Sequence, residues 1–264
     1  MKSSIKNILR SLAEASGFQV RKTSVYTSQK LRHHLLFSQL QIDLVVDVGA
    51  NTGQFAHQCR AAGYKGEIIS FEPSAAAHAS LLQSAAADPL WNVADRMALG
   101  ASDGEIEINI AANSFSSSIL PMLDSHLSAA PASQYLHKEK VQIRRLDDVL
   151  LPFDRQTDRN IFLKLDVQGY EPQVLAGANQ LLAHTLALQL EMSLVPLYEG
   201  EVLMQGICAA MTGSGFELWD FESSFRNPAT GRLLQIDGIF TRPSLDRSPA
   251  HGQPISPISL PLIQ

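Results

Sequence analysis

From residue 42 onward, the sequence alternates between short apolar runs and segments with helical periodicity. Apolar runs that are separated by helices are typical of parallel strands buried on both faces of a sheet. We therefore predict an α/β fold with a Rossmann-like, doubly wound and mostly parallel sheet. The predicted strands cover residues 42–48, 67–71, 92–99, 160–166 and 185–191, and the predicted helices cover residues 53–62, 74–87 and 172–183.

Two further patterns complete the predicted sheet. Residues 216–221 and 233–241 flank a turn-forming sequence at 227–231, which predicts a C-terminal antiparallel hairpin. Isoleucines alternate with polar residues over 105–110, which predicts one additional, half-exposed strand.

Charge and proline content divide the chain into three parts. Residues 1–40 hold seven Lys and Arg but one Glu, although the net charge of the chain is −5, and we predict a basic helical appendage there. Residues 41–242 form the predicted α/β domain, within which the Ser- and Ala-rich stretch 113–140 is a candidate lid or substrate loop. Five prolines in residues 243–264 predict an irregular tail.

Two interpretations of the basic appendage stay open. Ile5, Ile8, Leu9 and Leu12 recur at helical spacing, so the segment can form an amphipathic helix. Such a helix either covers one edge of the domain with its charges in water, or lies on anionic lipid or a lipid-linked substrate. The first interpretation follows from the general rule that runs of charged residues form solvated faces. The second would place the protein at the inner membrane surface.

Composition argues against several classes of protein. An acidic net charge disfavours broad binding to nucleic-acid phosphates. Cys59 and Cys208 lack the spacing of a zinc site or a disulfide framework. No apolar run approaches the roughly 18 residues of a membrane span, and the N-terminus has no apolar core of a secretory signal. We therefore expect a cytoplasmic protein.

The most informative segment ends the first predicted strand. There Asp47 is followed by Gly49 and Gly53, as expected where a buried strand turns sharply into a helix. Gly49 allows the backbone to approach a ligand closely, and N–H groups at a helix start attract electron-rich atoms. A dinucleotide-binding turn would have glycines where this chain has Asn51 and Gln54, so the pattern disfavours a pyrophosphate.

A second acid ends the neighbouring strand. Glu72 precedes Pro73, and in an open parallel sheet this strand end lies beside the turn at Gly49. Ligands of such sheets bind beyond the carboxyl ends of the strands, where a carboxylate can accept hydrogen bonds from both hydroxyls of a ribose. The spacing predicts a site for an adenosine-containing ligand. The alternative for Glu72 is a solvated charge at a helix start.

Several segments together resemble the class I S-adenosylmethionine-dependent methyltransferases, and within them the FkbM family. The block KLDVQGYE at 164–171 is similar to the family's own signature. The resemblance implies a seven-stranded sheet, bound S-adenosylmethionine that becomes S-adenosylhomocysteine, and O-methylation of a saccharide or a glycosylated or natural-product molecule. The segments that carry it lie at residues 46–53, 71–73, 98–105, 146–148, 163–171 and 190–191.

The resemblance also implies which residues bind the cofactor. They divide into the glycine turn that faces the methionine part, the acid that holds the ribose, and a segment that borders the adenine. These groups are Asp47, Gly49, Asn51 and Gly53 for the turn, Glu72 with Pro73 for the ribose, and Asp95, Met97 and Ala98 for the adenine.

Methyl transfer to an alcohol needs a group that takes up the hydroxyl proton, or a metal that acidifies it. Asp166 ends the fourth predicted strand and Glu191 the fifth, so both should face the donor. The pair can act as a base and its partner or bind a hard cation such as Mg²⁺; we favour the base and predict no metal. His126, within 113–140, is another candidate base.

Each catalytic candidate also has a structural interpretation. Asp166 can cap a helix or contact the following turn, Glu191 can belong to a structural ion pair, and His126 can be a solvated loop residue. The sequence predicts an O-methyltransferase that acts on a small-molecule or glycan acceptor, free or lipid-linked. Two alternatives stay open: a nicotinamide oxidoreductase, which the glycine pattern disfavours, and an adenosine-binding protein without catalysis.

Overall fold

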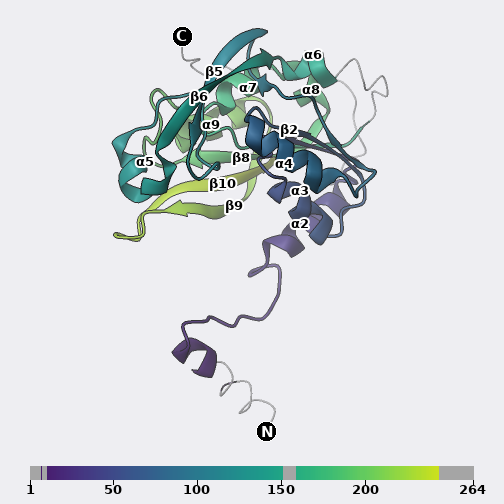
Figure 1. Ribbon diagram of the computed structural model, residues 1–264. Helices are drawn as coiled ribbons and strands as arrows, with labels where there is room; N and C mark the ends of the chain where they lie inside the picture. The colour runs from purple at the N-terminus through teal and green to yellow at the C-terminus, as the bar shows by residue number, and fades with distance from the viewer. Residues whose placement is uncertain (1–6, 8–10, 151–158, 244–264) are drawn as a thin grey trace.

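The computed structural model describes residues 7, 11–150 and 159–243. In these residues the main sheet has seven strands, of which five are parallel and two form an antiparallel end (Figure 1). In spatial order they are β3 (Trp91–Val93), β2 (Glu67–Phe71), β1 (Leu44–Val48), β7 (Ile161–Leu165), β8 (Thr185–Ser193), β10 (Leu233–Thr241) and β9 (Glu217–Arg226). The predicted fold class and the C-terminal antiparallel hairpin are confirmed.

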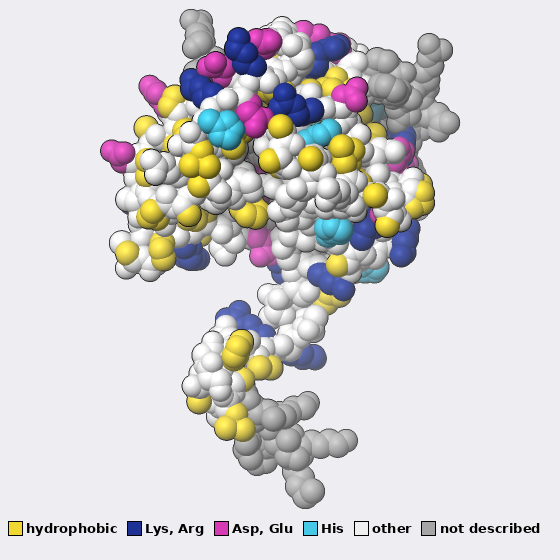
Figure 2. All heavy atoms as spheres, in the orientation of Figure 1, with side chains coloured by type: hydrophobic (Ala, Val, Ile, Leu, Met, Phe, Trp, Pro, Cys, Tyr) yellow, Lys and Arg dark blue, Asp and Glu magenta, His cyan; other side chains and the backbone are white. Residues whose placement is uncertain are grey.

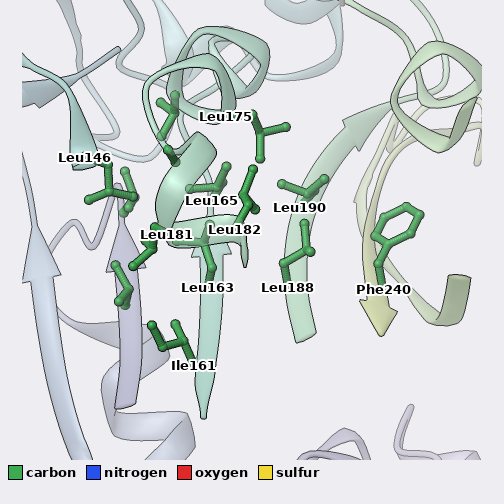
Figure 3. Packing of buried hydrophobic residues seen from close by; sticks show 14 of the residues in the cluster. Leu146, Ile161, Leu163, Leu165, Leu175, Leu181, Leu182, Leu188, Leu190 and Phe240 are labelled. Carbon is green, nitrogen blue, oxygen red and sulfur yellow. The ribbon is translucent and has the colours of Figure 1, made fainter. Parts of the chain in front are cut away.

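Helices cover both faces of this sheet because alternate strand residues point to opposite sides. Val45 of β1 packs in one apolar cluster, and Leu44 and Val46 pack in another. In the second cluster, Leu163 and Leu165 of β7 lie beneath leucines of the covering helices (Figure 3). The first cluster includes α2 (Gln29–Gln39), α3 (Gln54–Ala61) and α4 (Ala75–Ala85), and the second includes α6 (Leu146–Leu150), α7 (Glu171–Ala176), α8 (Asn179–His184) and α9 (Met204–Gly213).

The strand predicted over residues 92–99 is wrong as a single element, because its two ends belong to different sheets. β3 ends at Val93, whereas β4 (Ala98–Leu99) belongs to a three-stranded sheet with β5 (Gly104–Ala111) and β6 (Tyr135–Arg144). The additional strand predicted from the alternating isoleucines is β5 and is confirmed.

The helix predicted over residues 172–183 is also wrong as one element, because α7 and α8 are separate short helices. Gly177 lies between them, and a Cβ there would come within 2.0 Å of the carbonyl oxygen of Gly100. Close contact with this distant backbone segment therefore interrupts a sequence whose periodicity is helical throughout.

Residues 113–140 contain more regular structure than a loop. They include α5 (Asp124–Ala129), a 3₁₀ helix (Pro131–Ser133) and the first half of β6. Ser116, Ser118 and Ser133 are buried, and the hydroxyls of Ser116 and Ser133 lie 3.0 Å apart. Serines in this stretch therefore pack internally, and its role as a lid or substrate loop stays a prediction.

The predicted basic appendage divides near residue 28. Leu36 and Phe37 of α2 are buried in the core, whereas residues 11–28 extend away from the body of the protein (Figure 1). Phe18 and Tyr26 are 72% and 92% exposed, and Figure 2 shows hydrophobic and basic side chains together on this arm. Most of the predicted amphipathic helix and the Pro-rich tail beyond residue 243 lie outside the described residues. Within the described ranges, no helix has the length and apolarity needed to cross a membrane.

Helix α2, which lies within the predicted basic appendage, forms ion pairs with the edge strand of the main sheet. Arg32 of α2 forms an ion pair with Asp220 of β9 at 2.6 Å and a second ion pair with Glu222 on the same strand. Because β9 is the outermost strand, this contact links the first helix of the core to the sheet edge.

Candidate active site

A cavity of about 440 Å³ lies beyond the carboxyl ends of β1, β2, β7 and β8. The strand order reverses between β1 and β7, which is the switch point where open α/β sheets bind ligands. Residues 113–119 and side chains of β9 and β10 close its remaining sides. The cavity therefore brings together most of the residues that the sequence singles out.

Gly49 forms the turn at the floor of this cavity. Its φ is +74°, and a Cβ there would lie 1.9 Å from the carbonyl oxygen of Asp166. The backbone N–H groups of Gly49 and Ala50 both donate to the carbonyl of Phe71 at 3.0 Å, which ties the turn to the neighbouring strand. Only glycine permits both this backbone conformation and this close approach.

Asn51 continues the turn in a left-handed conformation with φ of +49°. Its side-chain amide donates to the hydroxyl of Ser114 at 3.3 Å, whereas its Oδ1 atom is buried without a hydrogen-bond partner within the described protein. An unpaired buried acceptor is costly unless a ligand satisfies it. Asn51 therefore has one free acceptor for a hydrogen-bond donor in the cavity.

Glu72 is 7% exposed, and its carboxylate ties the end of β2 to the glycine turn. One oxygen accepts from the backbone N–H of Asn51 at 2.8 Å, and the other accepts from the N–H of Ser74 at 2.9 Å. Each oxygen keeps a further lone pair for a ligand hydroxyl. Burial raises the pKa of Glu72 to about 7, although these two N–H groups act in the opposite direction.

Three of the predicted cofactor residues border the same cavity beside Glu72. They are Pro73, Met97 and Ala98, which give this end of the cavity an apolar wall. An apolar wall next to a carboxylate suits a nucleoside, with the base on the wall and the ribose on the acid.

Three other predicted cofactor residues do not line the cavity. Asp47 is fully buried beneath the turn, Gly53 packs where a Cβ would meet the ring of Trp91 at 2.5 Å, and Asp95 is exposed outside the cavity. The geometry gives Asp47 and Gly53 a part in shaping the turn and brings Asp95 into no contact with the cavity.

The sequence interpretation missed Lys164, which is the cation of the site. Its ammonium lies 3.5 Å from Asp47 and 3.2 Å from Asp166. Burial lowers the pKa of Lys164, but the charges of Asp166 and Asp47 outweigh this effect and hold the pKa above its ordinary value. Asp47 and Lys164 are paired across β1 and β7, and each lies one residue before the end of its strand. An acid and a base at matching positions of two predicted strands is the sequence pattern that could have predicted this ion pair.

Asp166 and Glu191 lie together in the cavity, as the sequence predicts. Asp166 has 34% of its side chain exposed, whereas Glu191 accepts from Ser224 at 3.0 Å and from Gln235 at 3.1 Å. Burial raises the pKa of Glu191 well above its ordinary value, and the nearby charges of Asp166 and Asp237 raise it further. Both carboxyl groups are half-buried, and Asp166 is the one that contacts the ammonium of Lys164.

His126 lines the cavity from α5 but is 2% exposed, so the solvated-loop interpretation is wrong. Its Nε2 atom lies 3.2 Å from the hydroxyl of Ser133, and its ring contacts those of Tyr198 and Phe225. Burial lowers the pKa of His126 to about 4, so its imidazole is neutral near pH 7 and is a weak base.

The charges of the cavity suit a cationic ligand. Among the described lining residues, four carboxyl groups face one ammonium group. The carboxyl groups belong to Glu72, Asp166, Glu191 and Asp237, and the ammonium to Lys164. Together with the free acceptor of Asn51 and the close approach allowed at Gly49, this arrangement fits a nucleoside that carries a positive sulfur.

Replacing Glu72 with Ala should weaken binding of S-adenosylhomocysteine by roughly 1–3 kcal/mol, because two ribose hydroxyls lose a buried acceptor. Isothermal titration calorimetry measures this change directly. Asp95→Ala is the matched control, since this acid lies on the same side of the sheet but outside the cavity. Equal affinities in the two variants would remove Glu72 from the ribose site.

Donor affinity should also depend on pH through Glu72. Because its pKa is about 7 in the free protein, the carboxyl is mostly protonated at pH 6 and mostly ionised at pH 8. A ligand that prefers the ionised form must displace the proton at low pH, so affinity should rise about tenfold from pH 6 to pH 8. Glu72→Gln should abolish this dependence, and an equal slope in that variant would assign the proton to another group.

Comparisons with known proteins give one family match. Residues 47–218 match the methyltransferase FkbM domain, which is more than half of the chain. No curated protein matches the chain. The resemblance read from the sequence motifs is thus confirmed, and the nicotinamide alternative is set aside.

Solved structures with a similar arrangement are distant in sequence. An rRNA methylase from Streptococcus thermophilus is 10% identical, with a TM-score of 0.43 over 84% of this chain and 98% of that chain. A TehB-like SAM-dependent methyltransferase from Corynebacterium glutamicum is 11% identical, with a TM-score of 0.40 over 92% of this chain and 100% of that chain. The family match, which runs from Asp47 through the strand ends at Asp166 and Glu191, shows that this chain belongs to the FkbM methyltransferase family, whose methyl donor is S-adenosylmethionine.

Proposed function

We propose that the chain transfers a methyl group from S-adenosylmethionine to a hydroxyl of a saccharide or a glycosylated or natural-product molecule. The observation that carries the proposal is the position of Asp166. Its carboxylate is accessible from the cavity, is paired with Lys164 at 3.2 Å and follows the strand next to the glycine turn. A carboxylate in that position can accept the proton of an acceptor hydroxyl.

Different residues would contact the methyl donor and the acceptor hydroxyl. S-Adenosylmethionine supplies the methyl group as a carbon activated by a positive sulfur. Glu72 and Asn51 would hold its ribose and methionine parts, and Pro73, Met97 and Ala98 its adenine. Asp166 accepts the hydroxyl proton, and Lys164 keeps the carboxylate in place. Positioning of this kind supplies much of the rate of an in-line displacement.

The acceptor side of the cavity supports a polyhydroxylated substrate. Around Glu191 its lining combines the polar side chains of Gln189, Ser224 and Gln235 with the ring of Phe225. Phe115, which lines the cavity from the segment 113–119, is 61% exposed. Neutral donors and acceptors beside aromatic surfaces match the alternating polar and apolar faces of a sugar ring.

Transfer of a labelled methyl group to a panel of acceptors tests the proposal. The panel contains free sugars, nucleotide sugars, lipid-linked and alkyl glycosides, an aromatic alcohol, an amine and an RNA, and product NMR locates the methyl group. We expect a methyl ether on a glycoside hydroxyl, with turnover unchanged by EDTA. Label on nitrogen or RNA would overturn the acceptor class, and loss of turnover in EDTA that Mg²⁺ restores would overturn the metal-free base.

A negative result is also informative. Binding of the donor without transfer to any member of the panel would support the adenosine-binding protein without catalysis. Transfer at the wild-type rate by the Asp166→Asn variant would instead remove Asp166 as the base.

A further inference from the structure

The exposure of residues 11–28 separates the two interpretations of the basic appendage. A helix that covers an edge of the domain would bury its apolar side chains against that domain. Along this arm, Leu12, Phe18, Val20 and Tyr26 are instead more than half exposed. The arm therefore leaves several large apolar side chains in water, and a concentration of this kind indicates an interaction surface.

The first part of the arm displays apolar side chains beyond a well-formed helix end. Residues 11–15 are helical, and Gly17 follows with φ of +80°. The backbone N–H of Phe18 donates to the carbonyl of Ala13 at 2.8 Å, which is the hydrogen bond of a Schellman motif. Phe18 and Val20 therefore lie directly after a helix that ends through local hydrogen bonds, without support from the domain.

The second part of the arm displays apolar side chains at a turn next to α2. The hydroxyl of Thr27 donates to the carbonyl of Lys22 at 2.6 Å and closes this turn, and Arg32 of α2 donates to the carbonyl of Val25 at 2.7 Å. These bonds hold the backbone of the turn to the domain. The side chains of Val25 and Tyr26 are nonetheless exposed.

Two cations lie between the two apolar parts of the arm. Arg21 and Lys22 are exposed, and Lys30 is exposed one turn further on, in α2. The chain from residue 41 onward is acidic, so the positive charge is confined to this end of the protein. Exposed cations that are flanked by aromatic and aliphatic side chains complement a phospholipid bilayer with anionic headgroups, because aromatic rings enter its interfacial region.

The length of the arm allows this contact although the domain is acidic. Residues 18–28 can span up to roughly 35 Å, whereas charges in water are screened over roughly 8 Å at physiological ionic strength. Because the arm extends away from the domain (Figure 1), its cations can reach an anionic surface while the acids of the domain stay beyond the screening distance. A second copy of the chain would also attract the cations, but it would need an apolar groove of matching shape. A bilayer accepts apolar side chains in any arrangement.

The arm joins the domain beside the cavity. Ser28 caps α2 at the end of the arm, and Gln29, the first residue of that helix, lines the cavity together with Gln54 and Gln58 of α3. The arm would therefore keep the cavity within its own reach of any surface that it binds.

We propose that residues 11–28 form a docking surface for an anionic phospholipid bilayer. The aromatic and aliphatic side chains enter the interfacial region, and Arg21 and Lys22 pair with lipid phosphates. This binding is independent of methyl transfer. One consequence does rest on the proposed function: among the glycosides proposed as acceptors, an arm of this kind favours those that are linked to lipid.

Co-sedimentation of the full chain with phosphatidylcholine vesicles, with and without phosphatidylglycerol, tests the docking surface. The wild type should bind anionic vesicles at least about 25-fold more strongly than neutral ones, and high salt should weaken this binding. Arg21→Gln combined with Lys22→Gln should lower binding to anionic vesicles about 25-fold, since each cation near such a surface contributes about fivefold. Phe18→Ser combined with Tyr26→Ser should lower it about tenfold or more, because the rings no longer enter the interface.

Matched controls remove the same kinds of side chain from the domain. Lys138→Gln combined with Lys140→Gln, and separately Leu136→Ser, alter exposed residues of β6 and should leave vesicle binding at the wild-type value. Wild-type binding by either pair of arm variants, or equal binding of the wild type to neutral and anionic vesicles, would overturn the proposal. Sedimentation equilibrium without lipid tests the other occupant: a dimer that both pairs of arm variants dissociate would assign the arm to a second copy and also overturn it.

Vesicle binding needs no methyl acceptor, so its outcome is separate from the proposed function. If the wild type methylates glycosides, the arm variants should lose about tenfold or more of the transfer to lipid-linked glycosides held in anionic vesicles, and keep the transfer to soluble alkyl glycosides. Equal transfer to the vesicle-held glycosides by the wild type and the arm variants would overturn the inference about the acceptor. Vesicle binding without transfer to any acceptor would uphold the docking surface and overturn the proposed function.

Discussion

Replacing Asp166 with Asn should lower turnover by roughly 10²–10⁴-fold while donor affinity is retained, because the amide keeps the shape of the side chain but cannot take up a proton. Asp166 lines the cavity with 34% of its side chain exposed and lies 3.2 Å from the ammonium of Lys164. Rates at saturating donor, together with calorimetry of S-adenosylhomocysteine, measure the two quantities separately.

Two controls make this result specific. Asp95→Asn changes an exposed acid outside the cavity and should leave turnover at the wild-type value. Thermal unfolding shows whether the loss of one partner of Lys164 disturbs the fold. Wild-type turnover in Asp166→Asn would assign this residue to structure and leave His126 and Glu191 as the remaining candidates for the base.

Replacing Gly49 with Ala should destabilise the protein by roughly 2–5 kcal/mol and abolish measurable donor binding. Two costs add at this position. The backbone must keep φ of +74°, and the new Cβ would lie 1.9 Å from the carbonyl oxygen of Asp166, so β1 and β7 must separate at the cavity. Thermal or urea unfolding measures the first effect, and calorimetry measures the second.

Gly231→Ala isolates the backbone cost. Gly231 has φ of +71°, and no atom lies within 4 Å of the position that its Cβ would occupy. This variant should lose about 1 kcal/mol, the cost of the left-handed conformation alone, and should bind the donor normally. Equal losses in the two variants would show that the contact between the turn and Asp166 is not tight in solution.

The parts of the fold that sequence patterns predicted correctly are those governed by local periodicity and burial. The strand predicted at residues 67–71 is β2 with the same bounds, because its apolar residues lie between clear turn signals. The site residues that follow strand ends, including Glu72, Asp166 and Glu191, were predicted because a parallel sheet collects those ends at one edge.

The parts that sequence patterns missed depend on contacts between distant segments. Gly177 interrupts a helical pattern because it packs against Gly100. The residues around position 177 contain no sequence signal that predicts this contact. The hydrogen bond of Tyr198 with Gln168 spans 30 positions of sequence, so it has no local signal. Burial of His126 likewise follows from the packing of α5 against Tyr198 and Phe225, not from its own neighbours.

The ion pairs of Arg32 with β9 have a practical consequence for handling the protein. β9 ends the sheet, and Phe221 on it is 61% exposed, so its outer rim is a template on which another strand could assemble. Charged groups held at such a rim oppose that assembly. A shortened protein that starts after Arg32 would leave Asp220 and Glu222 without their cation. A truncation made to aid crystal growth should therefore remove only residues that precede α2, which begins at Gln29.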